Sequence, residues 1–89
     1  MGIKLRIMTT EHGDKTYNLD TQQQIKQVVD EKIKPALEKG CILASKPEGE
    51  KEFKDVAVHK TSSREDVLNA FGAMNDGTQV LLSAPITAA

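Results

Sequence analysis

Aromatic side chains are scarce in this chain of 89 residues: they make up 3% of it, and tryptophan is absent. Aliphatic side chains and methionine must therefore fill the core. A domain of this length buries only about 60–65% of the surface that its unfolded chain exposes, so the core is small. A small core leaves little room for a substantial substrate pocket, and we expect a protein that is not an enzyme.

Cysteine occurs once, as Cys41, which excludes an internal disulfide and is typical of a reducing compartment. No apolar run approaches the roughly 20 residues of a membrane helix, and the alternating start of the sequence is unlike the core of a signal peptide. Gly2 does not complete a myristoylation motif, because position six is Arg6. We expect a cytoplasmic protein that contacts no membrane.

A dominant charge of either sign is also missing, since the formal net charge is −1. Without a basic face we expect no nucleic-acid partner. Neither His12 nor His59 has a second ligand at metal-binding spacing, and there is no Gly-rich phosphate loop, so we expect no metal and no cofactor. Cys41 is interpreted as a small buried hydrophobe, and Ser62 and Ser63 as a helix cap without catalytic residues beside them.

Alternating polarity is present at the N-terminus. Ile3, Leu5 and Ile7 alternate with polar or flexible residues, which predicts a strand with one buried face. A turn follows at residues 9–14, where Gly13 can take a positive φ. The alternation resumes up to Leu19, so the first nineteen residues predict a β-hairpin.

A capped amphipathic helix is predicted next. Asp20 or Thr21 caps it, since each has a glutamine three residues later. Pro35 predicts a kink or break near Lys34, with a last turn closed by Gly40. The residues at helical spacing form one apolar stripe, which must lie on a sheet: Ile25, Val28, Val29, Ile33 and Leu37.

The second half predicts shorter elements. Residues 41–45 are apolar enough for a buried strand, and residues 53–58 predict a further, irregular strand. A capped second helix is expected over residues 62–74, and a final strand over residues 78–83.

This order of elements, ββαββ(α)β, predicts an α+β fold. The first and last strands are both apolar and far apart in sequence, so we expect them to pair in parallel at the centre of a mixed sheet of about five strands. One main helix would pack across that sheet, which is the arrangement called the β-grasp. We expect a domain over residues 1–83 and a flexible C-terminal tail over residues 84–89.

At this point the chain resembles the ubiquitin-like β-grasp superfamily over nearly its whole length. The resemblance rests on the hairpin, on the capped helix with Ile25, Val29 and Ile33 inward, and on the closing segment 76–82. Residues 84–89, Ala-Pro-Ile-Thr-Ala-Ala, also resemble the Pro-Pro-Val-x-Gly-Gly ending of the small molybdopterin-synthase subunit and related sulfur carriers. The family implied is that of bacterial ubiquitin-like modifiers and sulfur carriers.

The resemblance implies a chemistry for the tail. Family members end in Gly-Gly, whose carboxylate an activating enzyme adenylates before passing it to a thiol, an amine or sulfide. Here Ala88 and Ala89 take those positions, after Pro85, Ile86 and Thr87. Either a Gly-Gly protein has been altered to stop this chemistry, or a native Ala-Ala relative acts by noncovalent docking alone. The implied partners are an activating enzyme and an acceptor protein, and we expect a monomer.

A partner-binding surface is expected beside this tail. If Val80 and Leu82 point into the core, strand alternation places Leu81 and Ser83 on the outer face of the last strand. An exposed leucine there would serve as a partner anchor.

Overall fold

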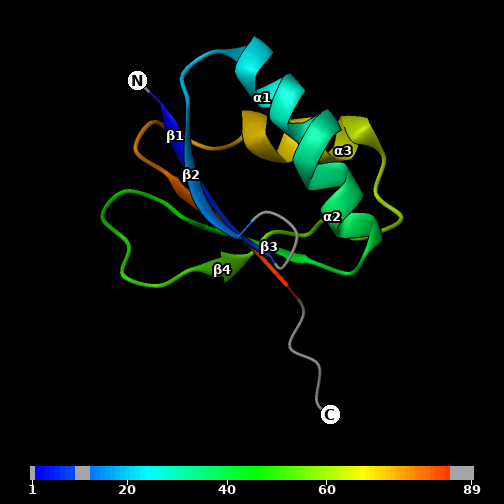
Figure 1. The fold of residues 1–89 in the computed structure, drawn as a ribbon. Coiled ribbons are helices and arrows are strands. Elements are labelled where there is room, and N and C mark those ends of the chain that lie inside the picture. The colour runs from blue at the N-terminus through cyan, green and yellow to red at the C-terminus, as the bar shows by residue number, and fades with distance from the viewer. Residues whose placement is uncertain (1, 10–12, 85–89) are drawn as a thin grey trace.

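Parallel pairing of the first and last strands forms the centre of the structure. The computed structural model describes residues 2–9 and 13–84. Its strands are β1 (Ile3–Thr9), β2 (Gly13–Leu19), β3 (Ile42–Lys46), β4 (Lys54–Asp55) and β5 (Gln79–Ser83), in the sheet order β2-β1-β5-β3-β4. β1 and β5 are parallel, whereas the other neighbouring strands are antiparallel. The helices lie on one side of this sheet (Figure 1). The predicted α+β class and the predicted parallel pair are confirmed.

The opening hairpin has a continuous register. β1 and β2 pair over all seven residues, from Ile3 opposite Leu19 to Thr9 opposite Gly13. Gly13 has a φ of 69°, a left-handed conformation that costs glycine little. The predicted hairpin is therefore confirmed, and its second strand, β2, forms one edge of the sheet.

Alternation along the strands separates a buried face from an open one. In β1, Ile3, Leu5 and Ile7 are buried, and the residues between them are exposed. The main helix buries Val29 and Ile33 completely in the same core, but Ile25 is only partly buried. Ile25 does pack against the core, as expected, but it is less buried than Val29 and Ile33.

The main helix begins at a capping box. It comprises α1 (Gln22–Val28), the π-helical segment η1 (Val29–Ile33) and α2 (Lys34–Glu38) in unbroken succession. Thr21 Oγ1 accepts a hydrogen bond from the Gln24 amide at 3.2 Å, and Gln24 Oε1 accepts one from the Thr21 amide at 3.1 Å. Of the two residues predicted as the cap, the structure selects Thr21.

Pro35 changes the hydrogen-bond pattern of this helix without ending it. The Lys34 N–H donates to the carbonyl of Val29, five residues back, so the turn before the proline is wider than an α-turn. Pro35 has no N–H, and its ring would collide with the carbonyl four residues back in a regular α-helix. Of the kink or break expected near Lys34, the break is not found: the helix continues through Pro35, with a π-helical turn before it.

Gly40 closes the last turn of the helix, as predicted. Gly40 has a φ of 93°, and its N–H donates to the Leu37 carbonyl at 2.9 Å. The Cys41 N–H reaches back to the Ala36 carbonyl at 3.0 Å. These two bonds form a Schellman motif, which satisfies carbonyls that the helix end would otherwise leave unpaired.

The segment after β3 is less regular than predicted. A strand over residues 53–58 is expected from the sequence, but β4 contains only Lys54 and Asp55. Val58 is buried outside any strand, and Phe53 remains 41% exposed. The irregular alternation reflects a loop that contributes isolated apolar residues to the core.

A second capped helix packs beside the first. α3 (Arg64–Gly72) begins at Ser63, whose hydroxyl accepts from the Asp66 amide at 3.1 Å, and it buries Val67 and Phe71. Asp30 of η1 accepts two hydrogen bonds from the Arg64 guanidinium, at 2.6 and 3.2 Å. This charge-assisted pair raises the pKa of Arg64 and holds the pKa of Asp30 below its ordinary value, chiefly through the hydrogen bonds.

Truncation of Ile33 tests the assignment of the core. Ile33→Ala removes a fully buried side chain, and we expect it to lower the free energy of unfolding by roughly 2–5 kcal/mol. Ile25→Ala, in the same helix but only partly buried, should cost clearly less. Urea denaturation measures both, and an unchanged midpoint for Ile33→Ala would contradict the core described above.

The ion pair between Asp30 and Arg64 predicts a pH dependence. Because the folded pKa of Asp30 is lowered, its stabilising contribution is present above the ordinary value of 3.8 and is lost as the pH falls through the lowered value. Asp30→Asn should thus be less stable than the parent protein at neutral pH, and the difference should shrink in strong acid. Urea denaturation over a pH series checks this, with Glu31→Gln in the same helical turn as the control.

Candidate functional site

The face of the sheet opposite the helices exposes apolar side chains at one end. Here β1, β5 and β3 lie side by side, so that Met8, Ser83 and Ile42 form one row across the sheet. The adjacent row contains Leu81 and Ala44. Side chains in neighbouring strands at such positions come within contact distance of one another. We call Met8, Ile42, Ala44, Leu81 and Ser83 the outer-face cluster.

The outer-face cluster is only partly shielded from solvent. Met8 and Ile42 are each 41% exposed, among the largest exposures of apolar side chains in the described residues. Leu81, Ala44 and Ser83 are half-buried by their neighbours. Exposed apolar groups that adjoin one another in this way are typical of contact surfaces, whereas single exposed leucines are common on any protein.

The cluster lies where β5 ends. The Ala84 N–H donates to the Met8 carbonyl at 3.2 Å, so the backbone is held beside β1 up to that residue. Regular strand pairing stops at Ser83, in agreement with the final strand predicted over residues 78–83. The last described residue, Ala84, therefore lies beside Met8.

Basic side chains border the cluster. Arg6 lies opposite Leu81 in the register, and it donates to both carboxylate oxygens of Asp14, at 2.9 and 2.6 Å. Those hydrogen bonds lower the pKa of Asp14 and fix the guanidinium over β2. On the other side, the Lys46 ammonium lies 5.4 Å from the centre of the Phe53 ring. The apolar residues thus have a polar rim, as interaction surfaces commonly do.

The residues predicted as partner-binding fall within this cluster. Val80 and Leu82 are buried, and Leu81 and Ser83 lie on the outer face, so the predicted alternation is confirmed. Leu81 is half-buried rather than freely exposed, because β1 and β3 flank it. The residues of the predicted activation tail lie outside the described residues: Pro85, Ile86, Thr87, Ala88 and Ala89.

Three members of the cluster, Met8, Ile42 and Ala44, are missed by reading the sequence. Residues 41–45 suggest a buried strand, yet Ile42 is 41% exposed and Leu43 alone is fully buried in β3. The strand contacts helices on one side only, so every second residue faces outward. Met8 follows Lys4 and Arg6 at every second position of β1, and these positions face away from the helices. Continuing this alternation along β1 would have placed Met8 on the outer face.

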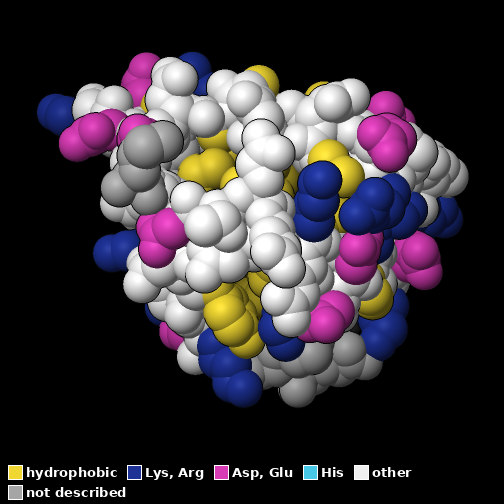
Figure 2. Space-filling model, turned by 90° about the horizontal axis from the view of Figure 1, so that it is seen from above, with side chains coloured by type: hydrophobic (Ala, Val, Ile, Leu, Met, Phe, Trp, Pro, Cys, Tyr) yellow, Lys and Arg dark blue, Asp and Glu magenta, His cyan; other side chains and the backbone are white. Residues whose placement is uncertain are grey.

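The helical side of the molecule has a different character. Figure 2 views the protein from above Figure 1, where the helices lie uppermost, and shows basic and acidic side chains interspersed there. Apolar side chains emerge in separate small areas between them. No helix in the described residues is long and apolar enough to cross a membrane.

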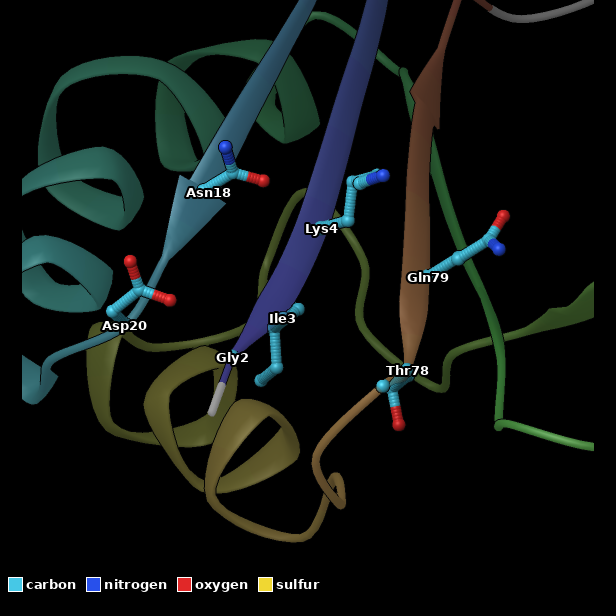
Figure 3. A pocket seen from close by; sticks show the side chains of 8 residues that line it. Gly2, Ile3, Lys4, Asn18, Asp20, Thr78 and Gln79 are labelled. Carbon is cyan, nitrogen blue, oxygen red and sulfur yellow. The ribbon is translucent and has the colours of Figure 1, made fainter.

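A hollow of about 290 Å³ lies at the other end of the sheet, where β1 and β5 begin (Figure 3). Lys4, Asn18 and Gln79 project from three neighbouring strands on one side of it, and all three side chains are exposed. The Thr78 side chain points away from Lys4 and Gln79, and its buried hydroxyl has no hydrogen-bond partner among the described residues. The Asp20 side chain also lines the hollow and is exposed, like those of Lys4, Asn18 and Gln79. Such a site can hydrogen-bond a polar group, but none of these charged side chains is buried, as the perturbed groups of an active site usually are.

Cys41 and His59 both line a second hollow, of about 380 Å³, which Leu37 of α2 also borders. Cys41 is half-buried at the end of the Schellman motif, and His59 is exposed. Within the described ranges, no group of three or more histidine, cysteine or carboxylate side chains could hold a metal ion. The arrangement therefore gives the outer-face cluster, rather than either hollow, as the candidate site.

The chain matches no protein-family model, no curated protein and no solved structure among those compared. Its function must therefore be argued from its own residues.

Two adjacent leucines test which face is open. Leu82→Ala removes a fully buried side chain and should cost roughly 2–5 kcal/mol of unfolding free energy. Leu81→Ala removes the same atoms from the half-buried outer face and should cost about 1 kcal/mol. Denaturant titration of the pair measures the contrast, and equal losses would mean that both faces of β5 are covered.

Proposed function

We propose that this protein is a ubiquitin-like β-grasp protein that docks through its outer-face cluster. In a form with glycine at positions 88 and 89, its tail would be adenylated by an activating enzyme, for conjugation to a protein or for sulfur transfer. The protein supplies the carboxylate and the docking surface. The enzyme supplies the catalysis.

The observation that supports this proposal best is the place of the outer-face cluster. It lies on the sheet face without helices, and it adjoins the point where β5 ends. An enzyme that bound the cluster would thereby hold Ala84, and with it the start of the tail, at a fixed distance from its own active site. Docking and presentation of the tail would then be a single binding event.

The β-grasp part of the proposal is supported by the sheet. Parallel pairing of β1 with β5, a hairpin at one edge and one long helix across the sheet agree with that arrangement. The apolar outer face with a polar rim supports a role in binding, as against a role confined to stability.

The alanines at positions 88 and 89 determine how the tail would react. An activating enzyme must thread the backbone through a narrow channel, where each added Cβ takes space and limits the backbone conformations. Ala88 and Ala89 should therefore obstruct the reaction more than the docking. A native Ala-Ala protein that only docks is the alternative function, and it uses the same surface.

Pyrophosphate exchange with an adenylating enzyme encoded beside this protein's gene tests the proposal. We expect exchange with the Ala88→Gly, Ala89→Gly form, and strongly reduced exchange with the alanine form, although both forms should bind the enzyme equally. Isothermal titration calorimetry measures the binding. Equal exchange by both forms would contradict the claim that the methyl groups of Ala88 and Ala89 obstruct the enzyme's channel.

A surface variant separates docking from tail chemistry. Leu81→Asp, introduced into the glycine form, should weaken binding at least tenfold, because it places a charge in the centre of the apolar cluster. Gln79→Asp changes the same strand at an exposed position outside the cluster and should bind normally. If the glycine form binds the enzyme but supports no exchange, the noncovalent module is the better account.

A further inference from the structure

The β2 strand leaves a long sheet edge open. β2 (Gly13–Leu19) pairs with β1 along its whole length, and the described residues supply no neighbour on its other side. The opposite edge of the sheet is covered in part by β4, which has only two residues. A free edge presents a row of backbone donors and acceptors that can pair with another strand.

This edge has few of the features that usually prevent such pairing. β2 contains no proline, and its register with β1 continues over seven residues without a bulge. Its charges are Asp14 and Lys15, one of each sign. Lys15 lies opposite the buried Ile7 and is nevertheless exposed, so it is the one charge placed on the helix-covered side of the edge.

We propose that two copies of this protein pair through their β2 strands, antiparallel and centred on Thr16. In this register Lys15 lies opposite Tyr17 of the other copy, and Asp14 lies opposite Asn18. Gly13 lies opposite Leu19, and the Thr16 residues of the two copies lie opposite each other. No like charges meet, and every residue of the strand has a partner.

The other symmetric registers are worse. Paired residues must lie on the same face of a continuous sheet, so the centre can move only by whole residues. A centre at Lys15 sets two lysines against each other, and a centre at Asp14 sets two aspartates against each other. A centre at Tyr17 brings Asp14 opposite Asp20, and a centre at Asn18 pairs only the end of the strand. Thr16 gives the longest overlap without a like-charge pair.

The symmetry of this pair has a consequence for binding. Its two-fold axis is perpendicular to the sheet, so both helical layers lie on one side and both outer-face clusters lie on the other. The pair would present two docking surfaces in one direction. The interface is small and polar, so we expect a weak, transient dimer with a dissociation constant in the micromolar to millimolar range. This inference departs from the monomer expected from the sequence, and it does not depend on the proposed function.

Charge changes at position 18 test the register. Asn18 is exposed at the strand edge and would face Asp14 of the other copy twice in each pair. Asn18→Lys should tighten the association about three- to tenfold, and Asn18→Asp should weaken it by a similar factor. Sedimentation equilibrium at low salt over a wide concentration range measures both, and added salt should reduce the difference.

Folding stability should respond in the reverse direction. Within one chain Asn18 lies opposite Lys4, so a lysine at position 18 disfavours the fold and an aspartate favours it. Gln79 lies in the same row on the central strand β5, between Lys4 and Lys46. Gln79→Lys and Gln79→Asp therefore repeat the charge changes away from the edge, and they should leave the association unchanged.

Nuclear magnetic resonance on dilution locates the interface. Concentration-dependent shifts of the backbone amides should fall within residues 13–19. Shifts confined to Met8, Ile42 and Leu81 would mean that copies meet through the outer-face cluster, which would overturn the proposal. A protein that stays monomeric at about millimolar concentration, or equal effects of the changes at positions 18 and 79, would overturn it as well.

Discussion

The register between β1 and β5 is the constraint on which the rest of the structure depends. Leu5 pairs with Val80 and Ile7 with Leu82, and all four side chains are buried on the same face. A shift of one residue would turn the buried side chains of one strand outward, so the core fixes this register. It also fixes which residues face away from the helices. The outer-face cluster is therefore a direct consequence of how the core is packed.

The sequence predicts those features of the fold that depend on local chemistry. Glycine at the hairpin and at the helix end, the threonine and serine caps, and the polarity of β1 are found as expected, because each is determined by a few neighbouring residues. The segment after β3 is predicted poorly. Phe53 and Val58 suggest a strand, but sheet pairing there is decided by contacts with β3. Regular pairing covers only Ala44 and Ser45, and one further hydrogen bond joins the Val56 N–H to the Leu43 carbonyl.

The candidate site is predicted in part for a similar reason. Leu81 and Ser83 can be located by alternation within β5 alone. Ile42 and Met8 come from other strands, and their place beside β5 follows from the pairing of β5 with β3 and with β1. A surface assembled from three strands cannot be read from one run of residues. A clear signal for Met8 is present nevertheless, since it continues the outward positions of Lys4 and Arg6.

The main helix shows how the fold accommodates a residue that would disrupt it. Pro35 could have ended the helix, but Ala36 and Leu37 after it are buried in the core, together with Val29 and Ile33 before it. The wider π-helical turn keeps both pairs facing the sheet while it moves the backbone away from the proline ring. Burial of the apolar stripe thus outweighs the poorer hydrogen-bond geometry of one turn. Both helical elements pack on the inner face of the sheet, so in the described part of the chain the outer face carries no helix and the side chains of the outer-face cluster remain partly exposed.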